Sequence, residues 1–116
     1  MHRLVSFTLL ACSAVLFISS QSFAAGVDAD AAQKLAKKND CFKCHALDKT
    51  KKGPSYKKIA EKYRDKDKAE AKDKMIKNIT TGPKVKLEDG TEEEHKIIKT
   101  KDPKELDNLV NWILSM

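Results

Sequence analysis

The sequence has few cysteine and histidine side chains. Its 116 residues include three cysteines and three histidines, and one of each lies within the first twelve residues. The remainder holds the motif CFKCH at residues 41–45 and, far downstream, His95. A zinc site built on Cys41 and Cys44 would need two further cysteine or histidine ligands at matching spacing. The sequence therefore argues against a structural zinc site.

No apolar run is long enough to span a membrane comfortably. Residues 4–19 are mostly apolar and uncharged, follow a short basic start, and lead to Ser22-Phe23-Ala24, the small-x-small pattern of a signal-peptidase site. We therefore expect a secretory signal over residues 1–24, cleaved after Ala24. The mature chain, residues 25–116, would then be a single periplasmic domain with no integral membrane span.

Lipid anchoring at Cys12 is a competing interpretation of the same region. Residues 9–12, LLAC, loosely resemble a lipobox, but Leu10 is bulky for its position and only eleven residues precede the cysteine. Removal of the signal would remove Cys12 with it.

Large apolar side chains are scarce in residues 33–56. A mature domain of 92 residues is small enough that its own side chains bury only a modest core. We therefore expect something other than side chains to fill the middle of the domain.

The CFKCH motif has several possible meanings in an exported protein. A Cys-x-x-Cys pair can be a structural disulfide, a thioredoxin-like redox couple, half of a zinc site or, when histidine follows directly, the attachment site of a c-type haem. The thioredoxin-like interpretation lacks a β-branched strand before Cys41. Only the haem interpretation uses all three residues, because Cys41 and Cys44 add across two vinyl groups and His45 becomes the proximal iron ligand. A surface disulfide with an uninvolved histidine is the alternative.

Four stretches have the apolar spacing of α-helices, so we expect an all-α domain without internal repeats. They are residues 28–38, 55–63 and 67–80, and a last helix that begins after Asp102, with Pro103 at its first position and Glu105 completing a capping box. The apolar stripes comprise Val27, Ala31, Leu35 and Ala36 in the first helix, Met75, Ile76 and Ile79 in the third, and Leu106, Leu109, Val110, Ile113 and Leu114 in the last. Gly82 should close the third helix, and Trp112 has a structural role.

Two stretches of the chain carry a resemblance to a known family. From Leu35 through CFKCHALDKTKKGPSYKKIAEKY, and again at LDNLVNWILSM, the sequence resembles the small bacterial class I cytochromes c, whereas the middle differs. The resemblance implies about four helices wrapped around one covalently bound haem c, with the N- and C-terminal helices packed together. It also implies that the Pro54 carbonyl accepts a hydrogen bond from His45, and that Tyr56 packs near the haem edge. An ordinary amphipathic aromatic at a helix start is the alternative for Tyr56.

The sixth iron ligand departs from the family pattern. Class I cytochromes usually present a methionine between the third and last helices, and this chain has none there. Met75 falls within a helical stripe, where methionine usually fills the core, and Met116 ends the chain. The loop over residues 83–101 offers His95 instead, 50 residues after His45 and 21 before the end of the chain. That is about where the family's methionine would fall.

His95 also has a simpler interpretation. It follows three glutamates, residues 92–94, and could belong to a solvated charged face, which would leave the iron open or lysine-ligated. However, Ile97 and Ile98 follow and need burial, which would bring this stretch onto the body of the protein. We therefore predict His95 as the second axial ligand. The Asp89-Gly90 pair also predicts a hairpin turn, although the glutamate run weakens this prediction.

Positive charge is concentrated around the motif. Residues 34–64 contain eleven basic residues and three acidic ones, whereas residues 65–116 contain eleven lysines and twelve acidic residues. A basic rim around a haem edge would steer the protein toward redox partner proteins with acidic docking surfaces. General solubility is the alternative explanation for these lysines. No nucleic-acid-binding motif is present, and we expect no nucleic-acid partner and a monomer.

Together these features predict a periplasmic electron carrier that is not an enzyme. Its haem iron would be ligated by His45 and His95, and because imidazole favours ferric iron more than thioether sulfur does, its potential should be lower than that of the methionine-ligated family members. Three alternatives stay open: a haem sensor with an open sixth position, the haem subunit of a periplasmic dehydrogenase, and a dithiol oxidoreductase without haem.

Overall fold

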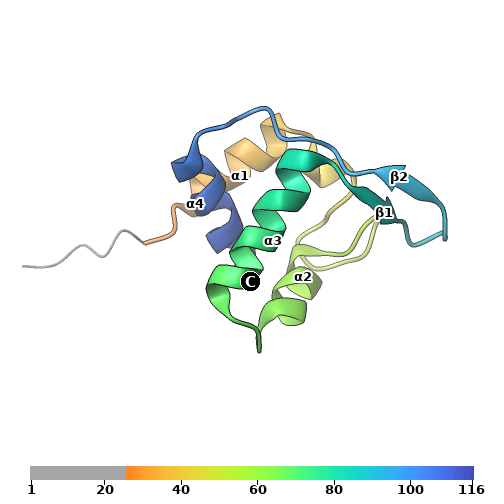
Figure 1. Ribbon diagram of the computed structural model, residues 1–116, viewed down its shortest axis with the longest axis horizontal. Helices are drawn as coiled ribbons and strands as arrows, with labels where there is room; N and C mark the ends of the chain where they lie inside the picture. The colour runs from red at the N-terminus through yellow and green to blue at the C-terminus, as the bar shows by residue number, and fades with distance from the viewer. Residues whose placement is uncertain (1–25) are drawn as a thin grey trace, which may run out of the picture.

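Four α-helices and one short β-hairpin make up residues 26–116, the part of the chain described by the computed structural model (Figure 1). The elements are α1 (Ala29–Lys38), the 3₁₀ turn η1 (Cys41–Lys43), α2 (Tyr56–Tyr63), α3 (Lys68–Thr81), β1 (Lys84–Lys86), β2 (Glu92–Glu94) and α4 (Pro103–Leu114). The predicted signal peptide, its cleavage after Ala24 and Cys12 lie outside the described residues. Within residues 26–116, no helix has both the length and the apolar character to cross a membrane.

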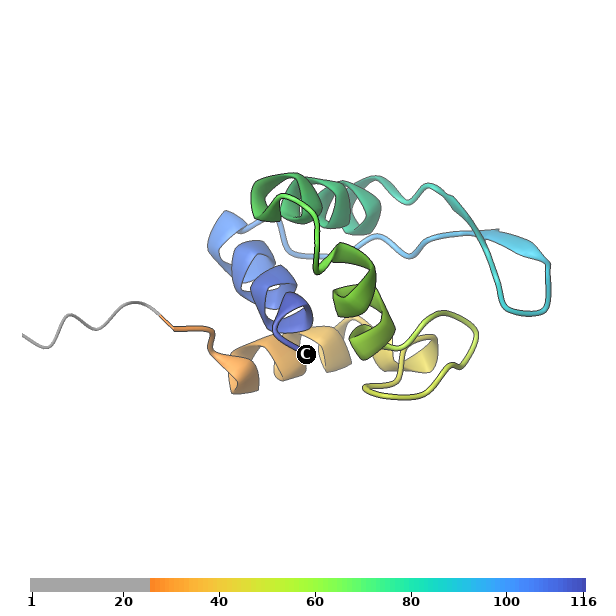
Figure 2. The same ribbon diagram turned by 90° about the horizontal axis from the view of Figure 1, so that it is seen from below.

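Helices α1 and α4 pack together, as the sequence predicted (Figures 1 and 2). A two-way hydrogen bond joins them, because the Asp28 N–H donates to Asn108 Oδ1 and Asn108 Nδ2 donates to the Asp28 carbonyl, both at 2.9 Å. The small, fully buried Ala32 and Ala36 let the helices approach closely, and Val110 of α4 is fully buried too. The first and last helices are thus held together by close packing and by these hydrogen bonds.

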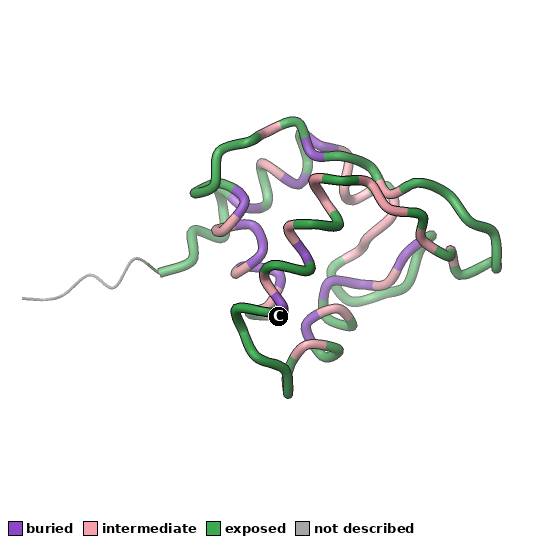
Figure 3. The backbone as a smooth tube through the Cα atoms, in the orientation of Figure 1, coloured by how far each residue is buried: buried purple, intermediate pink, exposed green. Residues whose placement is uncertain are grey.

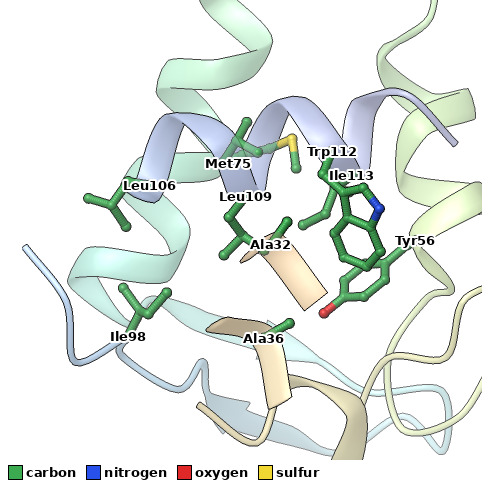
Figure 4. Packing of buried hydrophobic residues seen from close by; sticks show 10 residues of the cluster. Ala32, Ala36, Tyr56, Met75, Ile98, Leu106, Leu109, Trp112 and Ile113 are labelled. Carbon is green, nitrogen blue, oxygen red and sulfur yellow. The ribbon is translucent and has the colours of Figure 1, made fainter. Parts of the chain in front are cut away.

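The hydrophobic core lies between the four helices and includes Ile98 from the segment before α4 (Figures 3 and 4). Its buried members are Ala32, Ala36, Tyr56, Met75, Ile98, Leu106, Leu109, Val110, Trp112 and Ile113. Trp112 is buried and packs edge-on against the Tyr56 ring at 5.4 Å, which confirms its structural role. Met75 is 7% exposed and packed within this cluster, in keeping with its predicted place in a helical stripe.

Polar side chains mark where the helices begin. Each N-cap accepts a hydrogen bond from a backbone N–H two or three residues further on, at 2.9–3.0 Å, and the four caps are Asp28, Ser55, Asp67 and Asp102. Such caps satisfy N–H groups that the first helical turn leaves unpaired. Helix α3 ends at Gly82, whose φ of 62° is the left-handed conformation that glycine adopts readily. The predicted helix boundaries agree with the structure to within about one residue.

The predicted capping box at α4 is wrong. The Glu105 carboxylate accepts a hydrogen bond from the Thr100 hydroxyl, and that same hydroxyl accepts one from the Asp102 N–H at 3.2 Å. Thr100 therefore stands between the two residues that a capping box would join directly.

Three residues that were expected to be buried are exposed. Val27 and Ala31 are exposed, because Val27 precedes the first turn of α1 and the buried face of that helix runs through Ala32 and Ala36. Ile97 is 55% exposed whereas Ile98 is 7% exposed. Neighbouring side chains of an extended segment point to opposite sides, so only one of the two isoleucines can enter the core.

The hairpin predicted at Asp89-Gly90 is present between α3 and α4 and projects from the helices (Figure 2). Its register places Lys84 opposite Glu94 and Lys86 opposite Glu92. Two of the three glutamates therefore face lysines across the strand pair, where opposite charges are favourable neighbours, and Glu93 lies opposite Val85. This cross-strand pairing explains why an acidic run is tolerated in β2.

Candidate cofactor site

The CFKCH motif turns sharply away from the end of α1. Asp40 has φ 59°, a left-handed conformation uncommon outside glycine, and η1 follows at once. The N–H groups of Cys44 and His45 then both donate to the Cys41 carbonyl, at 3.2 and 3.0 Å. Both cysteines are free and half-buried, and burial raises the pKa of the Cys41 thiol. One tight turn thus presents two thiols and an imidazole together.

The His45 ring is held at one nitrogen by a backbone carbonyl. Its Nδ1–H donates to the Pro54 carbonyl oxygen at 2.6 Å, the hydrogen bond that the family resemblance implied. Because a carbonyl can only accept, the proton resides on Nδ1 and the lone pair of Nε2 is free. Burial lowers the pKa of His45, His95 lowers it further, and the Pro54 carbonyl opposes both. His45 is therefore a neutral imidazole with Nε2 available as a ligand.

Gly53 makes room for this ring. A Cβ atom at residue 53 would lie 3.0 Å from Cε1 and 3.3 Å from Nδ1 of His45, closer than carbon atoms normally approach. The Gly53 N–H also donates to the Cys44 carbonyl at 2.9 Å, which closes the loop after the motif. Sequence reasoning did not assign this glycine a role, because the contact becomes visible only when the loop has folded back.

Tyr56 lies beside His45 in an aromatic cluster. Its ring stacks on the His45 imidazole with centroids 5.5 Å apart and planes 19° apart, and Phe42 meets it edge-on at 5.8 Å. Tyr56 is 3% exposed, and burial raises its pKa far above the ordinary value, so the phenol stays neutral. The side chain braces one side of the His45 ring, and its contact with a haem edge stays a prediction. Phe42, inside the motif itself, is a second brace that sequence reasoning missed.

His95 follows β2 directly, and its ring lies near the ring of His45. The two ring centroids are 6.1 Å apart and the ring planes are inclined by 37°. The His95 N–H donates to the Pro83 carbonyl at 2.8 Å, which extends the hairpin ladder by one pair beyond β2. Strand alternation then directs His95 to the same side of the hairpin as the half-buried Val85, away from the exposed lysines of β1. The structure thus brings together two histidines that are 50 residues apart in sequence.

The His95 ring is also held through Nδ1. That nitrogen lies 2.9 Å from the Lys96 carbonyl oxygen, so it too carries the proton and leaves Nε2 free. Gly82 allows the close passage of this segment, since a Cβ there would lie 2.8 Å from the His95 carbonyl oxygen. Each histidine therefore has one nitrogen engaged by the backbone and the other available.

The spacing of the two rings suits a metal ion held between them. Metal–nitrogen bonds of about 2 Å on each side, plus about 2 Å for the two ring radii, give a centroid separation of roughly 6 Å. The observed 6.1 Å agrees with this. Within residues 26–116, no group of three or more histidine, cysteine or acidic side chains could hold a metal ion. The spacing of His45 and His95 fits an iron held by two imidazoles, whose remaining ligands would come from a cofactor such as haem.

Exposed lysines surround the motif. Those at positions 37, 38, 43, 49, 51 and 52 are all exposed, and Lys51 Nζ also donates to the Phe42 carbonyl at 2.7 Å. The loop after the motif is further tied to the hairpin, because the Glu88 N–H donates to the Lys52 carbonyl at 3.2 Å. The positive surface and the two histidines thus belong to the same end of the molecule.

Comparison with known proteins matches this chain to cytochromes c by family model, by sequence and by structure. The cytochrome c family model matches residues 29–116. The crystal structure of class 1 cytochrome MtoD from Sideroxydans lithotrophicus ES-1 is 58% identical in sequence, with a TM-score of 0.71 over 78% of this chain and 97% of that one. Wild-type Nitrosomonas europaea cytochrome c552 is 30% identical, with a TM-score of 0.57 over 72% of this chain and 96% of that one. A curated relative, cytochrome c-552 of Nitrosomonas europaea, is 47% identical over 53 residues, which are 46% of this chain and half of that protein.

Proposed function

Because the chain belongs to the cytochrome c family, we propose that it is a periplasmic carrier of single electrons whose haem iron is ligated by His45 and His95. The fold is that of the class I cytochromes, with haem c attached covalently and Cys41 and Cys44 as the two thiols of the CXXCH motif. When bound, the haem supplies reversible one-electron chemistry at iron. The roles of the surrounding residues follow from their contacts.

The facing pair of histidines is the observation that carries this proposal. Their centroids lie 6.1 Å apart, and each ring donates its Nδ1–H to a backbone carbonyl. That arrangement fixes the tautomer, orients each ring and makes Nε2 a better donor. Met75, the methionine nearest in sequence to the expected position, is buried in the core on α3. The geometry therefore favours imidazole in place of the family's usual thioether.

Two imidazole ligands support electron transfer instead of catalysis at iron. With both axial positions occupied, oxygen or peroxide has no free site at which to bind. Tyr56 stacks on His45, and Phe42 packs edge-on against Tyr56, so the His45 ring is supported on one side and its orientation can stay the same in both oxidation states. We accordingly propose that the protein is not an enzyme.

Spectroscopy of the holoprotein tests the ligand assignment. The wild type should show six-coordinate low-spin iron in optical and electron-paramagnetic spectra, and its ferrous form should bind carbon monoxide only weakly, because the gas would have to displace an axial histidine. His95→Ala removes the second imidazole and should give a five-coordinate or water-ligated spectrum with ready carbon monoxide binding. Met75→Leu, a change of similar volume on α3, should leave both readouts unchanged.

Two results would contradict the proposal. Ready carbon monoxide binding by the wild type would favour a ligand-binding or sensing function. An unchanged six-coordinate spectrum in His95→Ala would show that another residue ligates the iron, while the cytochrome identity would stand.

We further propose that the lysines around the motif steer the carrier to partners with acidic docking surfaces. The rate of electron exchange with an acidic redox protein should fall several-fold as ionic strength rises from about 0.01 to 0.15 M, because the Debye length shrinks from about 30 to 8 Å. Replacing Lys38, Lys49 and Lys52 with glutamine should weaken that salt dependence. Replacing Lys66, Lys68 and Lys104 with glutamine removes the same charge from exposed positions outside the motif, its loop and the hairpin, and should have a smaller effect. Equal effects of the two triple variants would mean that net charge alone matters.

A further inference from the structure

The segment that carries His95 runs past the end of α1, where it meets a buried amide. Asn39, the C-cap of α1, is 4% exposed, and its Oδ1 accepts a hydrogen bond from the Lys99 N–H at 2.9 Å. Its Nδ2 donates to the Leu35 carbonyl, also at 2.9 Å. One side chain thus joins α1 to the His95 segment, and both of its polar ends are satisfied.

Two backbone hydrogen bonds tie the same segment to α3 and its C-terminal end. The His95 N–H donates to the Pro83 carbonyl and the Ile98 N–H donates to the Ile79 carbonyl, both at 2.8 Å. The Ile98 side chain enters the core beside these residues. On their own, these contacts would let the segment and α3 shift together relative to the CFKCH motif.

Asn39 opposes that shift because it lies two residues before Cys41. The chain from Asn39 into the motif is short and sharply turned at Asp40, so a displacement at Asn39 is passed directly to the motif. An exposed ion pair between Lys96 Nζ and Asp40 Oδ2 at 2.6 Å spans the same gap. Exposed pairs of this kind contribute little, whereas the Asn39 amide is buried, so its hydrogen bond to the Lys99 N–H is better shielded from water.

We propose that Asn39 is a positioning residue that sets the separation between His45 and His95. The hydrogen bond from Lys99 holds the His95 segment against the start of the motif, and this fixes the second axial ligand within the few tenths of an ångström that ligation tolerates. This inference rests on the proposed pair of histidine ligands.

The test compares two substitutions at Asn39 in the holoprotein. Asn39→Leu keeps a similar volume but removes the acceptor, and it should raise the apparent affinity of ferrous iron for carbon monoxide about tenfold or more, because apparent affinity follows the fraction of molecules with His95 dissociated. Both substitutions remove the Nδ2 donor to the Leu35 carbonyl, so they differ in the acceptor. Asn39→Asp keeps an oxygen acceptor for the Lys99 N–H and should stay within about threefold of the wild type. The high-spin fraction of the ferric protein should change in parallel.

Two further variants test whether an effect on His95 is specific to the Asn39 hydrogen bond or follows from any weakening of the fold. Lys96→Gln removes the exposed ion pair on the same segment, and Ile113→Val removes one methyl group from the core far from it. Neither should change carbon monoxide binding. If Asn39→Leu fails to fold or to attach haem, Asn39→Ala serves in the same comparison.

The outcomes distinguish this inference from the proposed function. Carbon monoxide binding by the wild type as tight as that of His95→Ala would overturn both. Weak binding by the wild type, together with an Asn39→Leu variant that binds no more tightly, would overturn only the role of Asn39. An equal rise in carbon monoxide affinity in Asn39→Leu and Asn39→Asp would also overturn it, because the loss of the acceptor oxygen would then not be the cause.

Discussion

Replacing Cys41 and Cys44 with serine should abolish the cooperative unfolding transition of this protein. The segments on either side of the site have almost no apolar anchor of their own: between Cys41 and Ser55 the only fully buried residues are Gly53 and Ser55, and the hairpin contributes none. Without the covalently held porphyrin, these segments have little to pack against. The expected loss is the whole stability of a small domain, about 5–10 kcal/mol.

This expectation is measured by calorimetry and far-ultraviolet circular dichroism of the double serine variant, purified from a host without haem-attachment machinery. The material should show no haem absorbance, reduced helical signal and a broad thermal transition. Cys41→Ser alone, expressed with the attachment machinery, keeps one thioether and should keep a cooperative transition at lower temperature. A sharp transition in the haem-free double variant would mean that the core of α1, α3 and α4 carries the fold without a cofactor.

His95→Met should raise the midpoint potential by about 0.1–0.3 V, a fraction of the roughly 0.8 V range that axial ligands set in haem proteins. Thioether sulfur favours ferrous iron, whereas imidazole donates more strongly and favours ferric iron. For one electron, about 59 mV corresponds to a tenfold change in equilibrium constant, so the driving force toward a given partner would change by about two to five orders of magnitude.

Potentiometric titration followed by optical absorbance measures this shift. Met75→Leu is the matched control, because it changes a methionine that packs in the core, and its potential should stay within about 0.03 V of the wild type. An unchanged potential in His95→Met, with an unchanged low-spin spectrum, would remove His95 from the iron. A raised potential together with carbon monoxide binding would indicate that methionine at this position cannot reach the iron.

The accuracy of the sequence predictions depended on the range of the interactions involved. Helix starts at Asp28, Ser55 and Asp102 depend on contacts within three residues, and the structure has them where the sequence placed them. Ile97 was wrongly expected to be buried, because the direction of a side chain in an extended segment depends on its neighbours in the fold. Glu105 was wrongly paired because Thr100, just before the helix, competes for the same hydrogen bonds.

The sequence by itself determined the chemistry at one end of the site. Two thiols and an imidazole within five residues form a local unit, and the hydrogen bonds from the Cys44 and His45 N–H groups to the Cys41 carbonyl close the turn within the motif itself. Local caps and turn residues likewise determined the helices and the hairpin. Only the tertiary structure decided that His95 faces His45 at 6.1 Å, and that Gly53, Gly82 and the buried Asn39 shape their surroundings. The separation of two side chains 50 residues apart depends on how α1, α3 and α4 pack, and no local pattern in the chain encodes that distance.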